Sequence, residues 1–164
     1  MSSLALTDGG LETSLIFHQG VNLPFFAAFP LVETEDGQAA LRRYWAPYLA
    51  LAREHDVGFV LDTATWRANP DWAAKLGYDA QSLHAVNRAA VAFARELAVD
   101  QPAVLIEGVV GPRGDGYTVG EEMAPDEAAA YHVHQLEALA GAGVDQVAAV
   151  TFTYPHEAIG FVRA

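Results

Sequence analysis

Residues 57–65 have the sequence VGFVLDTAT, and residues 103–110 have the sequence AVLIEGVV. Both stretches are nearly continuous in Val, Leu, Ile, Phe and Ala. A strand that is apolar along its whole length is typical of a parallel sheet covered on both faces, whereas a strand with one solvated face alternates between apolar and polar residues. The two stretches therefore predict an α/β protein built on a parallel sheet.

Two further apolar stretches, Leu4–Thr7 and Gln146–Thr153, complete a set of four predicted strands. Helical patterns lie between them, at Gln38–His55, Asp79–Ala98 and Asp126–Ala142. In each of these, apolar residues recur three and four positions apart, which is the spacing of one helix face. The chain thus alternates strand and helix, as expected for right-handed βα crossovers.

The third predicted helix has a clear start and stop, because Pro125 introduces it and Gly141 and Gly143 mark its end. A fourth helix is predicted to begin near residues 156–158. The segment Phe17–Asp36 fits neither a helix period nor a strand period. We expect it to be an ordered loop over one end of the sheet.

Four βα units are compatible with two architectures. One is a small doubly wound sheet that binds a ligand where the strand order reverses. The other is the first half of a TIM (β/α)8 barrel, a fold of about 250 residues. The sequence ends inside a starting helix, which is typical of a truncated protein but decides little between the two architectures.

The composition excludes several function classes. The formal net charge of −12 and the pI of about 4.7 argue against binding to nucleic acid or to an anionic membrane. The chain has no cysteine, and therefore no disulfide, thiolate ligand or thiol nucleophile. Neither a signal-peptide pattern nor an apolar run long enough to cross a bilayer is present, so we expect a cytoplasmic protein.

The first candidate site residues follow the first strand, where Asp8 precedes Gly9 and Gly10. Ligands of α/β proteins bind at the carboxyl ends of strands, and glycines let the backbone approach a ligand closely. Asp8 is therefore either a carboxylate that holds the amino group of a small substrate or an ordinary turn or helix-cap residue.

The second strand is followed by Thr63, Thr65, Trp66 and Asn69. These side chains either line a pocket or serve the fold, with Trp66 in the core and Asn69 turning the chain before Pro70.

Other polar residues allow similar alternatives. Glu107 lies within an apolar strand and must be paired, protonated or functional. The glycine-rich segment 108–116 could hold an anion, although it lacks the known phosphate-binding patterns. His132 and His134 are two apart on a helix, so we expect packed or solvated histidines rather than a metal site. Thr151 could face a ligand.

Together these motifs resemble the homocysteine S-methyltransferase family. The resemblance covers nearly the whole chain and rests on the following residues: Asp8-Gly9-Gly10 after the first strand; Thr63, Thr65, Trp66, Ala68 and Asn69 after the second; Gly108, Gly111 and Pro112 at the third; Tyr131, His132, Gln135, Leu139 and Gly143-Val144-Asp145 leading into the fourth; and Glu157-Ala158 after it.

The resemblance implies a (β/α)8 barrel, of which residues 1–164 would be the N-terminal half, without a second domain. In that barrel Zn²⁺ binds a thiol substrate as thiolate, which then attacks an activated methyl group to give methionine. Zinc suits this chemistry because a coordinating thiol is deprotonated. By similarity, the substrate-binding residues are Asp8, Gly9, Gly10, Thr65, Trp66, Asn69 and Thr151. The partners implied are a small-molecule thiol and a sulfonium, betaine-type or other methyl donor.

The sequence also departs from the family pattern. The family's zinc-binding cysteines follow later strands, and Val150 stands where well-studied members carry a Glu. Ala64 replaces a common Asn. We therefore expect no catalytic residue and no metal ligand in this chain, which would be inactive by itself. Two other hypotheses are a zinc-independent barrel protein for another amino-acid-like or cationic ligand, and a non-catalytic half-barrel that forms homo-oligomers through its exposed sheet edges.

Overall fold

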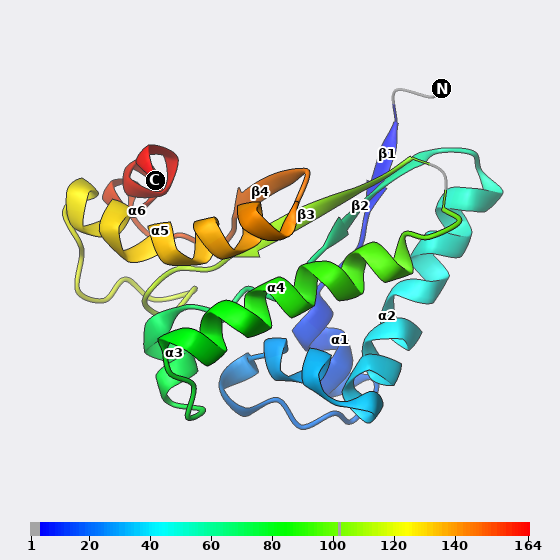
Figure 1. Cartoon of the computed structure of the whole chain (residues 1–164), viewed down its shortest axis with the longest axis horizontal. Coiled ribbons are helices and arrows are strands. Elements are labelled where there is room, and N and C mark those ends of the chain that lie inside the picture. Colours follow the sequence, from blue (N-terminus) through cyan, green and yellow to red (C-terminus); the bar gives the residue numbers. More distant parts are fainter. Residues whose placement is uncertain (1–3, 102) are drawn as a thin grey trace.

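The computed structural model describes residues 4–101 and 103–164. Its sheet has four parallel strands, each hydrogen-bonded to the next one along the chain (Figure 1). The strands are β1 (Ala5–Thr7), β2 (Gly58–Asp62), β3 (Val104–Val110) and β4 (Gln146–Ala149). A doubly wound sheet needs a reversal of strand order, which is absent among these four strands. The sequential order confirms the barrel-type prediction.

Each strand is followed by one of four helices that lie close to the ranges predicted from the sequence. They are α2 (Glu35–Glu54), α4 (Ala80–Leu97), α5 (Pro125–Ala142) and α6 (Pro155–Arg163). The Asp79 side chain caps α4 by accepting from the Ser82 amide at 2.8 Å, and Gly143 ends α5 with a φ of 88°. No helix in the described part of the chain is both long and apolar enough to span a bilayer.

The structure corrects several sequence predictions. Strands β2 and β4 end earlier than predicted, because the backbone turns at residues 63–65 and adopts a φ of 61° at Thr151. The predicted loop 17–36 is ordered but contains two 3-10 helices, η1 (Pro24–Phe26) and η2 (Phe29–Glu33). Two short helices were not predicted from the sequence, because they are too short for a clear helical period: α1 (Leu11–Phe17) and α3 (Pro70–Ala74).

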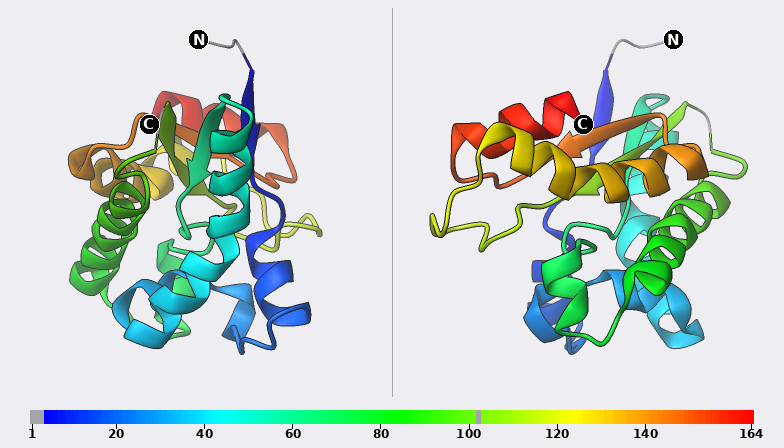
Figure 2. Two further views of the ribbon diagram at one scale, coloured as in Figure 1. Left: turned by 90° about the vertical axis from the view of Figure 1, so that its right-hand side faces the viewer. Right: turned by 60° about the vertical axis from the view of Figure 1, so that its left-hand side comes forward.

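The main core lies between the sheet and a helical layer that α2, α4 and α5 form along it (Figures 1 and 2). Phe59 of β2 stacks on Tyr48 of α2, and Leu139 of α5 packs against Gly108 of β3. On α2, the Trp45 ring contacts Phe93 of α4. These contacts bury one face of the sheet.

The other face of the sheet carries polar groups. Side chains alternate between the two faces of a strand, so Asp62 points away from Leu61, which is fully buried on the helical side. Asp62 lies opposite Glu107 in the β2–β3 register, and Glu107 lies opposite Gln146 in the β3–β4 register. Glu107 is half-buried and accepts a hydrogen bond from the Gln146 side chain. In a closed barrel this face would point inward.

Candidate functional site

A cavity of about 290 Å³ lies at the carboxyl ends of the strands. This is the edge at which α/β barrels bind their ligands. Segments that follow β1, β2 and β4 reach the cavity, as do α1 and the loop between β3 and α5. The lining residues are Asp8, Gly9, Gly10, Leu11, Glu12, Thr13, Phe26, Asp62, Thr63, Trp66, Val109, Tyr117, Val150 and Thr151. Parts of the sequence that lie far apart therefore build one concave surface.

Five of the seven sequence-predicted site residues line this cavity. They are Asp8, Gly9, Gly10, Trp66 and Thr151. Trp66 and Thr151 come from different loops and are joined by a hydrogen bond of 3.0 Å from the indole Nε1 to the Thr151 hydroxyl. The structure thus brings together residues that follow three of the four strands.

Asp8 follows β1 directly and is partly buried. Its Oδ2 accepts a hydrogen bond of 2.8 Å from the indole nitrogen of Trp45, a core residue of α2. Burial raises the pKa of Asp8 to about 6, although the hydrogen bond from Trp45 acts in the opposite direction. A carboxylate held in this way has a fixed orientation and gains from a cationic ligand, because a nearby positive charge favours its ionised form.

Two further acidic groups line the cavity. Burial raises the pKa of Glu12 to about 7. Burial, with the negative charges of Asp8 and Glu107, raises the pKa of Asp62 to about 8. The buried Oδ1 of Asp62 accepts no hydrogen bond from the described residues. Such grouped carboxyl groups with raised pKa values are typical of ligand-binding and catalytic sites.

The glycine-rich segment after β3 packs against Trp66. A Cβ at Gly111 would lie 2.3 Å from the Trp66 carbonyl oxygen, and a Cβ at Gly116 would lie 2.7 Å from the Thr151 hydroxyl. The Gly111 amide also donates to the Trp66 carbonyl at 3.0 Å. These glycines therefore allow the loop to lie flat on the indole, which accounts for them without a bound anion.

Thr65 and Asn69 do not line the cavity. Thr65 is fully buried, and its hydroxyl donates to the Val109 carbonyl at 2.7 Å, which ties β3 to the turn after β2. Asn69 caps α3, and its Nδ2 donates to the Pro112 carbonyl at 3.0 Å. In this structure both residues hold loops together, which was the alternative that the sequence left open for Asn69.

His132 and Glu157 form a buried pair between α5 and α6. Both side chains are fully buried, and His132 Nε2 lies 3.0 Å from Glu157 Oε1. The same oxygen accepts from the Arg113 amide at 2.7 Å, and the imidazole stacks on Phe152. His134 is exposed, so the two histidines do not converge, as the sequence predicted.

No set of metal ligands is available in the described chain. Among residues 4–101 and 103–164, no three His, Asp or Glu side chains are grouped so that they could hold a metal ion. The whole sequence lacks cysteine. The family resemblance implies a zinc ion held by thiolate ligands. The residues of this chain therefore do not fit that zinc ion.

Glu12 and Asp62 line the cavity but were not predicted as site residues from the sequence. Asp62 could have been predicted as a candidate, because it is an acidic residue inside an apolar strand. The same pattern had identified Glu107 as a candidate. Glu12 was harder to find, because its position depends on α1, which was not predicted. Phe26 reaches the cavity from η1 and Tyr117 from the loop between β3 and α5, and sequence periodicity carries no information about either residue.

Comparison with known proteins agrees with the family resemblance of the sequence motifs. The sequence profile of the family described as homocysteine S-methyltransferase matches residues 5–164. The oxidized form of the homocysteine methyltransferase MmuM from Escherichia coli matches with a TM-score of 0.75 and 26% identity, over 95% of this chain and 56% of that chain. Its metallated form matches with a TM-score of 0.70 and 24% identity, over 94% and 55%. No curated protein sequence gives a significant match. The chain spans about half the length of these solved structures.

Proposed function

The chain belongs to the homocysteine S-methyltransferase family, and we propose that it binds the amino-acid end of a thiol substrate such as homocysteine. The single observation that carries this proposal is the position of Asp8, at the end of β1, in the cavity and fixed by Trp45. An α-ammonium group is a strong donor for a carboxylate, and such charge-assisted hydrogen bonds are stronger than neutral ones.

The rest of the cavity suits the same ligand class. Gly9 and Gly10 leave space beside Asp8 because they carry no side chain. Trp66, Phe26 and Tyr117 add aromatic surface. Aromatic faces attract sulfonium and ammonium groups by roughly 0.5–2 kcal/mol, so we propose a methyl donor of this kind for the whole protein.

We assign no step of methyl transfer to the residues of this chain, since they provide no ligand set for zinc. We propose that this chain binds and orients the substrate. The protonation states of Asp8, Glu12 and Asp62 would change with the charge of the bound substrate. A bound ammonium group would lower the pKa of Asp8 and release a proton from the fraction of molecules in which it is protonated.

The proposal is tested by titrating the chain with homocysteine at pH 7 by NMR or calorimetry. We expect saturable binding and at least a tenfold loss of affinity for Asp8→Asn, because the charge-assisted hydrogen bond is lost. The matched control is Asp56→Asn, which changes an exposed carboxylate outside the cavity and should leave affinity unchanged. Equal affinities of the wild type and Asp8→Asn would refute the role of Asp8.

A second candidate is a barrel protein that binds another small amino-acid-like or cationic ligand without zinc. It is favoured by Val150, which lines the cavity and presents an apolar surface where well-studied family members carry a carboxylate. A thermal-shift comparison separates the two proposals. Stabilisation by a non-thiol amino acid or a quaternary amine, with none by homocysteine, would favour this second candidate.

A further inference from the structure

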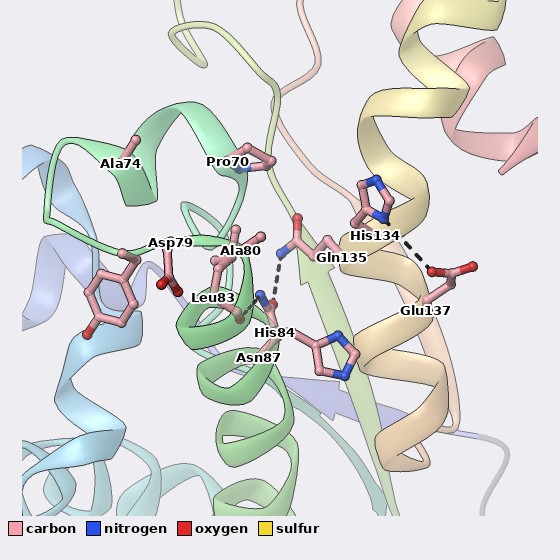
Figure 3. A pocket seen from close by; sticks show the side chains of 11 residues that line it. Pro70, Ala74, Asp79, Ala80, Leu83, His84, Asn87, His134, Gln135 and Glu137 are labelled. Atoms are coloured by element: carbon pink, nitrogen blue, oxygen red, sulfur yellow. Dashed lines mark hydrogen bonds and ion pairs between the residues drawn. The ribbon is translucent and has the colours of Figure 1, made fainter.

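A second cavity, of about 370 Å³, lies outside the sheet between the α3–α4 segment and α5 (Figure 3). It shares no lining residue with the cavity at the strand ends. Pro70, Ala74 and Leu83 form an apolar wall on one side, and His134 and Gln135 of α5 lie on the other. Its volume falls within the range of about 300–1,000 Å³ that is usual for small-molecule sites.

Gln135 lines this cavity, and its side-chain oxygen lacks a hydrogen-bond donor among the described residues. Its side chain is 3% exposed, and its Nε2 donates to the Thr65 carbonyl at 2.9 Å and to Asn87 Oδ1 at 3.2 Å. Because both partners of the nitrogen are acceptors, the orientation of the amide is fixed. Its Oε1 is buried and receives no hydrogen bond from the described residues. Figure 3 shows this oxygen turned away from Asn87 in the space between the helices. A buried acceptor without a donor destabilises the fold, so a ligand that supplies a donor gains from binding there.

The charge of the cavity favours a cationic donor. The lining includes the carboxylates of Asp79 and Glu137 and contains no Lys or Arg. Hydrogen bonds from Ser82 lower the pKa of Asp79, so this group is ionised near neutral pH. Glu137 is exposed, and its nearest ionic contact is His134 at 4.0 Å. The net charge of −12 of the chain adds a long-range attraction for cations.

We propose that this outer cavity binds a small organic ammonium ion, which donates an N–H to Gln135 Oε1 and packs its apolar part against Pro70, Ala74 and Leu83. The Asp79 and Glu137 carboxylates stabilise the charge at the cavity rim. This site is separate from the proposed homocysteine site and does not depend on methyl transfer.

The test titrates the ¹⁵N-labelled chain with benzylammonium, which has a compact apolar ring and an N–H donor. Benzyltrimethylammonium keeps the ring and the charge but lacks the donor, and benzoate reverses the charge. We expect saturable shifts around α4 and α5 with benzylammonium, at least tenfold weaker binding of the trimethyl compound, and no binding of benzoate.

Two variants locate the site without touching Gln135, which also supports the core. Ala80 is exposed and lines the cavity, so Ala80→Trp places an indole in it. The control is Ala85→Trp, which places an indole at an exposed position of α4 that does not line the cavity. Both should unfold like the wild type. Loss of benzylammonium binding only in Ala80→Trp supports the proposal. It is overturned by an absence of saturable binding, by equal binding of the two ammonium compounds, or by unchanged binding in Ala80→Trp.

Discussion

Replacing Asp62 with Asn is expected to stabilise the chain increasingly as the pH rises. The carboxyl group of Asp62 has a pKa of about 8 in the folded chain and 3.8 as its ordinary value, because it is buried beside Asp8 and Glu107. The folded state thus retains a proton that the unfolded state has lost. For a group with a raised pKa, the contribution to stability is fully present below pH 3.8 and is lost as the pH rises to about 8. Asn cannot ionise, so it removes this loss.

The magnitude follows from the two pKa values. Each pH unit between them changes the free energy of unfolding by at most about 1.36 kcal/mol, or about 2.7 kcal/mol from pH 5 to pH 7. Asp62 is partly exposed and is repelled by three other carboxyl groups, those of Asp8, Glu107 and Glu12, so we expect about half of this, roughly 1–1.5 kcal/mol.

Urea unfolding followed by circular dichroism, at several pH values from 5 to 8, measures this effect. The advantage of Asp62→Asn over the wild type should grow with pH at unchanged m-value. Asp56→Asn, in an exposed loop, should differ from the wild type by a constant amount at every pH. An advantage of Asp62→Asn that stays constant, or shrinks as the pH rises, would refute the reasoning.

Three other outcomes are expected. Gly111→Ala should destabilise the chain by about 1–3 kcal/mol in thermal or urea unfolding, because its Cβ would overlap Trp66, whereas Gly114→Ala, with open space around it, should be nearly neutral. Trp45→Phe removes the hydrogen bond to Asp8 and should raise the pKa of that carboxyl group above about 6, as measured by ¹³C NMR; an unchanged titration would contradict the assigned contact. Homocysteine should bind about tenfold more tightly at pH 7 than at pH 5, since the pKa of Asp8 is about 6; equal affinities would show that its ionisation is not involved.

Much of the fold could be predicted from residue patterns. The predicted strands 57–65 and 103–110 are nearly continuous in apolar residues, and the helices between the strands have regular spacing and recognisable ends. The short helices α1 and α3 and the 3-10 helices of residues 24–33 escaped prediction because they depend on packing rather than on local period. Leu23, Phe29 and Val32 reach the core only because the loop that carries them folds over the ends of α2 and α4.

The candidate site was partly predictable for a related reason. Asp8, Trp66 and Thr151 directly follow strands, and parallel strands bring their carboxyl ends to one edge. Thr65 and Asn69 also follow a strand, but their side chains turn to backbone carbonyls of the next unit. Strand order alone cannot say which polar group after a strand faces the ligand and which one holds the loop, since this depends on partners far away in sequence.

The sequence by itself determined the alternation of strands and helices, the family, the acidic character and the lack of cysteine, because these depend on local pattern and composition. Only the tertiary structure decided that Asp62 stands beside Glu107, that Trp45 fixes Asp8, and that Gln135 keeps a free acceptor between two helices. Each of these facts concerns residues more than thirty positions apart or the space left between packed helices. Burial and charge at such points arise from three-dimensional proximity, which no local pattern encodes.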